Sequence, residues 1–274
     1  WRSIHRVVAL SVNVRARDVL ARLQAEMRAG SISDEMWNLY TSRRLEPNDR
    51  RLTEGLFAEN PVHFVVHRHR IRVMRSLENA KAQSRALQVP LYILQAKDVT
   101  VREEDEEKLT NEQQIQLLRR VNPEHTKGLA SFLPLYIGMR LLLSSKDCVR
   151  FGIMKGCPCI LRDIVFSEHE VLPEKTLSGH EIKLQHMPVS LILQVEQAQW
   201  SLPLTELPTT LPANIDRRGL FQLRPSYDYL RMHVGTEYVS IRRTSFLVMP
   251  ADTITVYAAQ GSTFKAVVAD MYTR

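Results

Sequence analysis

One polar segment near the C-terminal end carries residue types that could do chemistry. In T-I-T-V-Y-A-A-Q-G-S-T-F-K-A-V-V-A-D, Thr253 to Asp270, a helix-like run and a strand-like run are joined by Gln260 to Thr263, which we call the Q-G-S-T corner. Core segments rarely place Gln, Gly, Ser and Thr together for packing alone, because buried polar groups need hydrogen-bond partners. The pattern indicates a contact outside the core, but residue types alone do not identify the ligand.

A second polar stretch lies near the other end, in L-S-V-N-V-R-A-R, Leu10 to Arg17. Arg15 and Arg17 fall where a strand-like run gives way to a helix-like run. An arginine at a helix N-terminus is slightly unfavourable against the helix macrodipole, so an anionic partner would explain its presence. Solvated residues at a helix start are the alternative, which residue types alone favour.

The histidines and cysteines do not have the spacing of a metal site. His63, His67 and His69 straddle the end of a predicted strand, where their side chains diverge, and Cys157-Pro-Cys159 is tighter than the usual zinc knuckle. A structural zinc site needs two paired ligand spacings of the C-x-x-C or H-x-x-x-H kind. We therefore expect surface histidines and small apolar cysteines, and no metal site.

Hydrolase and nucleotide-binding signatures are missing. The sequence contains no G-x-S-x-G and no H-E-x-x-H, so a serine-hydrolase or zinc-protease centre is not supported. It also contains no G-x-x-x-x-G-K-[ST], the loop whose backbone N–H groups cradle nucleoside phosphates. The chain by itself therefore lacks a P-loop.

Composition describes an ordinary globular protein with a basic balance. The 274 residues are 44% hydrophobic and carry a net charge of +7, which suits a polyanion partner. Three cysteines indicate a reducing compartment, and no apolar run reaches the length of a bilayer span. With no signal peptide visible, we expect an intracellular protein without membrane contact, in the nucleus rather than the mitochondrion.

The order of predicted elements indicates an α/β protein. Strands and helices alternate in the first part, and the region after Ser131 is dominated by strands with Pro-containing linkers. Gly30 is placed to end a first helix and Ser33 to cap a second one. In the first part we predict strands at 7–14, 62–66 and 91–96, and helices at 15–29, 33–40, 68–87 and 111–121. In the helix at 68–87, Ile71, Met74 and Leu77 are expected to face inward. Later strands are predicted at 136–143, 158–166, 189–195, 221–223, 237–248 and 265–271, with a short helix at 251–259.

Four segments, in order, resemble the C-terminal half of Pif/RecD-type superfamily-one DNA helicases. V-V-A-L-S-V-N-V-R-A (7–16) resembles the family's L-T-x-N-x-R segment, and M-R-A-G-S-I-S-D-E-M-W-N-L (27–39) its R-x-G-x-x-x-x-x-x-W-x-x-L helix pair. L-P-L-Y-I-G-M-R-L-L-L (133–143), with G-I-M-K-G after it, resembles L-x-x-G-x-x-V-M-L … G-L-x-N-G. R-R-T-S-F-L-V-M-P-A-D-T-I-T-V-Y-A-A-Q-G-S-T (242–263) resembles R-x-Q-x-P-L-x-x-A-x-A-x-T-I-H-K-x-Q-G-x-T.

The resemblance implies a fold and a division of the chain. It implies a second RecA-like domain, of the P-loop NTPase type, with a β-rich, SH3-like insertion. Residues 1–143 would form the first part with its N-terminal helices, 144–239 the insertion, and 240–274 the return to the RecA-like domain. Because the chain begins at Trp1 and stops at Arg274, we expect a fragment, with the P-loop and the Mg²⁺-binding motif upstream and a final arginine motif downstream.

The resemblance also implies roles for individual residues. Arg15 matches the catalytic arginine that reaches the γ-phosphate from the second domain, where removal of such a charge costs about 10³-fold or more in rate. Gln260 and Gly261 match the nucleotide-binding Q-G pair. Thr255 and Thr263 match hydroxyl positions near the DNA backbone, and Tyr257 replaces the usual histidine with a ring that can stack on a base.

The sequence departs from the family pattern at several positions. Ala258 replaces the usual lysine, which removes one charge that would neutralise a phosphate. Lys155, Ser245 and Leu247 replace the usual asparagine, glutamine and proline. These departures put the catalytic competence of the parent protein in doubt.

The leading hypothesis is therefore a fragment of an ATP-dependent 5′-to-3′ DNA helicase that uses ATP and Mg²⁺ in its full-length form. Its expected partners are single-stranded DNA and the missing first RecA-like domain, and we expect a monomer. Repair, recombination and telomere maintenance are expectations from the family alone. A non-catalytic nucleic-acid-binding remnant, decayed or derived from a mobile element, is the alternative. A basic β-barrel module unrelated to helicases is a third hypothesis.

Overall fold

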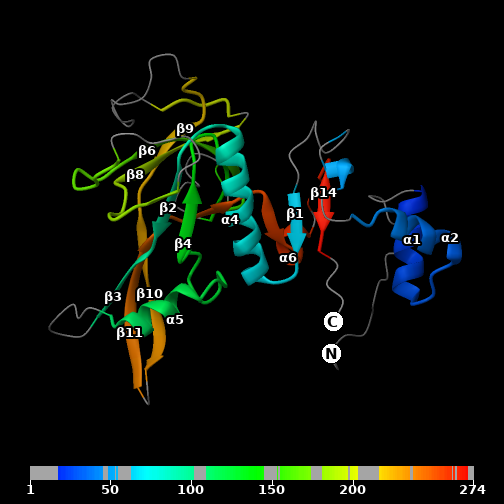
Figure 1. Cartoon of the computed structure of the whole chain (residues 1–274), viewed down its shortest axis with the longest axis horizontal. Helices are drawn as coiled ribbons and strands as arrows, with labels where there is room; N and C mark the ends of the chain where they lie inside the picture. Colours follow the sequence, from blue (N-terminus) through cyan, green and yellow to red (C-terminus); the bar gives the residue numbers. More distant parts are fainter. Residues whose placement is uncertain are drawn as a thin grey trace, which may run out of the picture. The chain divides into compact units, whose positions relative to one another are not determined.

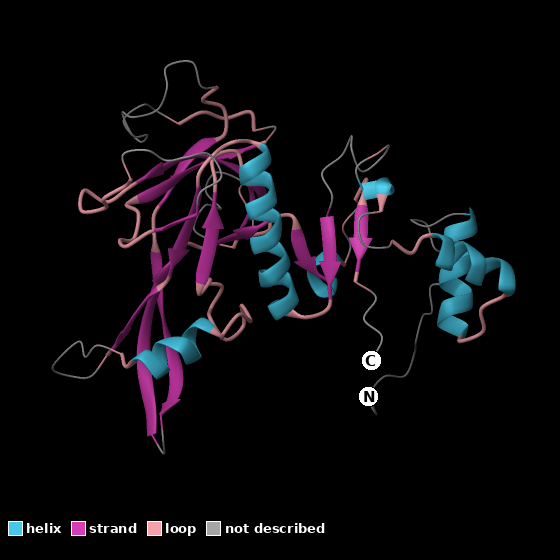
Figure 2. Ribbon diagram, in the orientation of Figure 1, coloured by secondary structure: helices cyan, strands magenta, loops and turns pink. Residues whose placement is uncertain are grey.

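The structure is a computed structural model with several sheets and packed helices, which confirms the α/β class (Figures 1 and 2). The chain divides into two compact units, residues 1–59 and 60–274. The structure describes residues 18–45, 49–52, 54, 63–101, 109–144, 153, 155–173, 181–196, 198–202, 216–234, 237–260, 262 and 264–270.

In the smaller unit, a glycine and a serine define two helices as predicted. Helix α1 (Asp18–Ala29) ends at Gly30, whose φ of +73° suits glycine. The N–H groups of Gly30 and Ser31 donate to the carbonyls of Met27 and Glu26, each at 3.2 Å, which is the Schellman arrangement. Helix α2 (Asp34–Ser42) is capped by Ser33, and a single 3₁₀ turn follows at Arg50–Leu52. The strand predicted at 7–14 lies outside the described residues.

The Glu26 carboxylate stabilises the turn between these helices by hydrogen bonds. Glu26 accepts from the Ser33 backbone N–H at 2.8 Å and from the Ser33 hydroxyl at 2.7 Å. The backbone bond is the main reason that the pKa of Glu26 lies below its ordinary value. Met36 is buried, while Trp37 is about half exposed. Among the described residues of the smaller unit, caps and polar contacts therefore define the two helices.

The larger unit begins with a three-stranded parallel sheet. Strand β1 (His63–Val66) lies between β13 (Thr253–Thr255) and β14 (Val267–Ala269), and both pairings are parallel. Helix α4 (His69–Ala86) follows β1 and packs on β1 and β13 (Figure 1). Parallel strands joined by helical crossovers are compatible with a RecA-like helicase domain.

Helix α4 packs through small residues, and this corrects one part of the sequence prediction. We predicted that Ile71, Met74 and Leu77 face inward, but Met74 is 54% exposed. The buried positions are Ser76, Ala80 and Ser84. Small side chains let the helix approach strands on both sides, because α4 also contacts β2 and β4. An apolar stripe is therefore not the feature that orients this helix.

Antiparallel sheets make up most of the rest. Only the second half of the strand predicted at 136–143 is a strand: β4 ends before it at Leu135, a turn with Gly138 at φ +93° follows, and β5 begins at Arg140. The five-stranded sheet has the order β12-β5-β6-β8-β9, and its largely aliphatic core includes Leu141 and Leu193. Its strands are β5 (Arg140–Leu143), β6 (Pro158–Val165), β8 (Ser190–Val195), β9 (Leu220–Leu223) and β12 (Val248–Pro250). A smaller sheet contains β2 (Leu91–Gln95), β4 (Phe132–Leu135) and β7 (Glu181–Lys183).

A further three-stranded sheet has the order β10-β11-β3. Strands β10 (Ser226–Val234) and β11 (Glu237–Ser245) form a long hairpin, and β3 (Lys97–Thr100) pairs with β11. Helix α5 (Asn111–Leu118) covers one face, where Leu117 packs with Leu230, Met232 and Ile241. Strand β10 is an addition to the strands predicted from the sequence.

The sheets run across both boundaries of the predicted division at residues 143 and 239. Strand β5 pairs with β6, and β11 begins before residue 240 and pairs with β3. The division into 1–143, 144–239 and 240–274, and the SH3-like character of the insertion, stay predictions.

Candidate functional site

The carboxyl edge of the parallel sheet collects the polar residues singled out in the sequence. Val66 and Thr255 are register partners at the ends of β1 and β13, so the segments after both strands begin at the same edge. His67 follows β1, and helix α6 (Val256–Ala259) follows β13 and contacts β1. In open α/β sheets, ligands bind outside the carboxyl ends of the strands. This edge is the candidate site.

Thr255 has a structural task at this edge. Its side chain is only 5% exposed, and its Oγ1 accepts from the backbone N–H of Ala258 at 3.4 Å. The hydroxyl thus caps α6 and fixes the direction in which the helix leaves the sheet. A contact between Thr255 and a DNA phosphate stays a prediction.

Tyr257 and Gln260 are the accessible members of the site. Tyr257 is 78% exposed, so both its ring and its hydroxyl are open to a partner. Gln260 is exposed and ends α6, with its backbone N–H donating to the Tyr257 carbonyl at 3.3 Å. Ala258 is also exposed, at the position where the family pattern carries a lysine. The described surface of α6 therefore offers an aromatic ring and an amide, but no cation.

The remaining predicted residues lie outside the described part of the chain. Arg15, Gly261 and Thr263 are not described. The structure places Thr255, Tyr257 and Gln260 on one short helix and its two caps. An approach of Arg15 to these three residues stays a prediction.

Polar contacts beneath the edge hold β13 on the sheet and on α4. Asp252 Oδ2 accepts from Asn79 Nδ2 of α4 at 2.6 Å, and His63 Nδ1 lies 3.2 Å from the Ala251 carbonyl oxygen. Burial raises the pKa of Asp252 above its ordinary value. Its second oxygen, Oδ1, is buried and has no hydrogen-bond partner among the described residues. These contacts fix the start of β13 and hence the position of α6.

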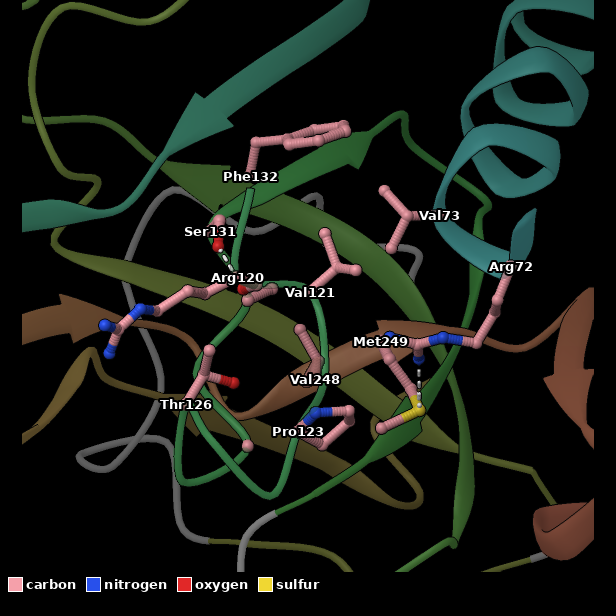
Figure 3. A pocket seen from close by; sticks show the side chains of 12 residues that line it. Arg72, Val73, Arg120, Val121, Pro123, Thr126, Ser131, Phe132, Val248 and Met249 are labelled. Carbon is pink, nitrogen blue, oxygen red and sulfur yellow. Dashed lines mark hydrogen bonds between the residues drawn. The ribbon is translucent and has the colours of Figure 1, made fainter. Parts of the chain in front are cut away.

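A small cavity lies next to this region, but its size excludes a nucleotide. Figure 3 shows Arg72 of α4 reaching over the thioether of Met249, with Nη1 at 3.2 Å from Sδ, and Val248 and Phe132 lining the wall. Burial lowers the pKa of Arg72. The cavity measures about 30 Å³, which is room for about one water molecule.

Among the described residues there is no group of three or more His, Cys, Asp or Glu side chains that could hold a metal ion. No helix in the described part of the chain is long and apolar enough to cross a membrane.

Comparison with known proteins gives matches among solved structures alone. No protein-family model matches the sequence, and no curated protein matches it. A structure of the Pif1 helicase from Candida albicans is similar over 92% of this chain and 47% of that one, with 15% identity and a TM-score of 0.49. The Pif1 helicase from Bacteroides in complex with ADP-AlF3 and ssDNA is similar over 93% of this chain and 43% of that one, with 12% identity and a TM-score of 0.45.

A third structure, of two coordinating Pif1 helicases that unwind forked dsDNA, is similar over 93% of this chain and 41% of that one, with 12% identity and a TM-score of 0.46. The chain thus spans less than half the length of these proteins. At such identities and TM-scores, the likenesses do not by themselves assign a function.

Proposed function

We propose that this chain is the second RecA-like domain, with its β-rich insertion, of an ATP-dependent 5′-to-3′ DNA helicase of the Pif/RecD type. In the full-length protein, ATP and Mg²⁺ would bind between this domain and a first RecA-like domain. Hydrolysis would drive movement along single-stranded DNA. The chain alone, without a P-loop, would bind single-stranded DNA weakly and not hydrolyse ATP.

One observation carries the proposal. The T-I-T-V-Y-A-A-Q segment forms β13 and α6, and it leaves the parallel sheet at the edge where β1 also ends. A motor of this kind needs one short element that contacts both nucleotide and DNA. A helix held by a buried cap at Thr255, with Tyr257 exposed, suits that task.

Tyr257 provides the direct test. Stacking of a base on an aromatic ring contributes roughly 1–3 kcal/mol, so Tyr257→Ala should weaken oligo(dT) binding by about fivefold or more. Tyr257→Phe keeps the ring and should bind like the wild type. Val256→Ala is a matched control, because Val256 is a neighbouring exposed residue on the same helix. Fluorescence anisotropy of a labelled oligonucleotide measures all three. Equal affinity of Tyr257→Ala and wild type would remove Tyr257 from the DNA site.

Catalysis has its own test. Measurable ATP hydrolysis by the purified 274-residue chain would contradict the assignment of a single RecA-like domain. In the full-length parent, Arg15→Ala should abolish hydrolysis and leave nucleotide binding largely intact, because the guanidinium would act on the transferring phosphoryl group. Loss of nucleotide binding with hydrolysis preserved would reject that role.

The second candidate is a non-catalytic nucleic-acid-binding remnant of a helicase. The exposed Ala258 favours it, because the helix lacks the cation that the family pattern places there. The coding sequence upstream of Trp1 separates the two candidates. An intact G-x-x-x-x-G-K-[ST] there supports the motor, and its absence supports the remnant.

A further inference from the structure

The outer face of the β10-β11-β3 sheet is open and unusually aromatic. Side chains alternate between the two faces of a strand, so β10 directs Leu230 and Met232 to the buried face covered by α5. The intervening positions face outward. Tyr227 is 64% exposed and Tyr229 50% exposed, and Tyr238 across the hairpin is 74% exposed.

The same face carries basic residues. Register places Arg242 opposite Tyr229, and Lys97 of β3 opposite Thr244, which in turn pairs with Tyr227. Arg231 continues the row along β10 and is exposed, as is Lys97. Among the described outward positions of the three strands, none is acidic. The charge of this face is therefore of one sign.

The aromatic rings are arranged in pairs along the hairpin. The Tyr227 and Tyr229 ring centroids are 6.1 Å apart with an interplanar angle of 85°. Those of His233 and Tyr238 are 4.9 Å apart at 89°. Arg231 lies between the two pairs along β10, and the Arg120 guanidinium donates to the Arg231 carbonyl at 2.6 Å on the outer edge of this strand. One cation, Arg231, thus separates the two aromatic pairs along the hairpin.

We infer that this face, which we call the tyrosine platform (Tyr227, Tyr229, Tyr238, Arg231 and Lys97), binds single-stranded nucleic acid. Unpaired bases stack on exposed aromatic rings, and cations beside the rings neutralise the phosphates. An open sheet with aromatics at alternate positions is a geometry that presents rings to successive bases. A duplex hides its base faces and cannot use the rings. The platform is built on other elements than α6 and goes beyond the function proposed for α6.

The test compares two double variants of the whole chain. Tyr227→Ala/Tyr229→Ala should weaken binding of a labelled oligo(dT) of about 20 nucleotides by about 25-fold or more, since each of the two lost stacks costs at least about fivefold. Tyr227→Phe/Tyr229→Phe keeps the rings and should bind as tightly as the wild type. Binding of duplex DNA of the same length should be equal for all three. Circular dichroism and thermal melting establish that each variant is folded.

Photo-crosslinking keeps the proposal testable even if the alanine variant does not fold. Oligo(dT) containing 5-iododeoxyuridine should crosslink wild-type chain at Tyr227, Tyr229 or Tyr238, identified by peptide mass spectrometry. Crosslinks confined to other residues overturn the proposal. So does unchanged affinity of the folded alanine variant, or an equal loss in the phenylalanine variant. If the alanine pair alters only the oligomeric state, the face is a protein interface and the proposal is wrong.

The two DNA proposals fail independently. Tyr257→Ala reports on the α6 surface, and the Tyr227/Tyr229 variants report on the platform. If only Tyr257→Ala loses affinity, the DNA binds at α6. If only the Tyr227/Tyr229 alanine variant loses affinity, the DNA binds at the platform.

Discussion

The guanidinium of Arg243 and the carboxylate of Asp98 face each other across neighbouring strands and form a two-bond ion pair in the interior. Arg243 Nε and Nη2 donate to the two Asp98 oxygens at 2.8 and 2.7 Å, and the Arg243 side chain is fully buried. Nη1 donates to Ser131 Oγ at 2.9 Å, and Nη2 also donates to the Leu117 carbonyl at 3.0 Å. One side chain thus joins β11, β3, the end of α5 and the start of β4.

Removing this arginine should strongly destabilise the larger unit. Arg243→Met leaves the Asp98 carboxylate buried without its counter-ion, a change that typically costs about 3–5 kcal/mol. Urea denaturation of the variant and the wild type measures the loss. The control is Arg243→Met with Asp98→Leu, which removes both charges and should recover part of the stability. Equal instability of single and double variants would show that packing, not the unpaired charge, dominates.

Two glycines should differ in their tolerance of a side chain. Both Gly156 and Gly219 have positive φ, but a Cβ on Gly156 meets no atom within 4 Å, whereas on Gly219 it lies 2.5 Å from the Val195 carbonyl oxygen. Gly156→Ala should cost about 1 kcal/mol from φ alone. Gly219→Ala should cost clearly more, because the backbone of the β8–β9 connection must move. Thermal melting compares them, and equal melting temperatures would contradict the clash.

Asp252 should make stability depend on pH. Because its folded pKa is raised, the folded state holds its proton more tightly than the unfolded state. Its contribution to stability is therefore largest below the unfolded pKa of about 3.9 and is lost as pH rises through the folded pKa. Relative to the wild type, Asp252→Asn should gain unfolding free energy between about pH 3.5 and pH 7.5. Denaturation at both pH values measures the difference in unfolding free energy between Asp252→Asn and the wild type. If that difference stays constant with pH, the pKa of Asp252 is not the source of the pH dependence.

Restoring a cation to α6 should strengthen DNA binding. Ala258 is exposed beside Tyr257, so Ala258→Lys adds a charge at the candidate site without changing the core. One added phosphate contact should tighten oligo(dT) binding at low salt and steepen the slope of log K against log salt by about 0.7 for a single strand. Ala258→Gln is the matched neutral control. If the slope of log K against log salt is the same for Ala258→Lys and the wild type, the DNA does not bind at α6.

Local signals in the sequence were sufficient for local structure. Gly30 and Ser33 affect only residues close to them in sequence. The C-terminal end of α1 and the N-cap of α2 could therefore be predicted from residue types. Two strands of the parallel sheet, β1 and β14, were also predicted, since short apolar runs between polar segments mark them. The third, β13 (Thr253–Thr255), lies in the run predicted as a helix at 251–259, and only its last part, α6, is helical. The alternation in S-Y-D-Y-L-R-M-H-V was the signal for β10. The same alternation also predicts that Tyr227 and Tyr229 face outward.

Features that depend on distant partners could not be read from neighbouring residues. Arg242 and Arg243 are adjacent in sequence, yet Arg243 is buried because its strand position faces Asp98, which lies far away along the chain. The buried face of α4 is made of Ser76, Ala80 and Ser84, and sequence periodicity cannot distinguish these from solvated small residues. The resemblance predicts Thr255 as a DNA contact, while its role as a helix cap depends on the structure around the end of β13.

The pairing of β1 with β13 and β14 has a consequence for how the protein is made. Phe64 pairs with Thr253 and Val268, so the central strand of the parallel sheet finds its partners only in the last residues of the larger unit. Contacts this distant in sequence slow folding, because a long loop must close before they form. During synthesis, β1 leaves the ribosome long before its partners and both of its edges stay unpaired. A nascent chain at this stage is prone to aggregate, and we expect the larger unit to complete its fold only after translation has passed Ala269.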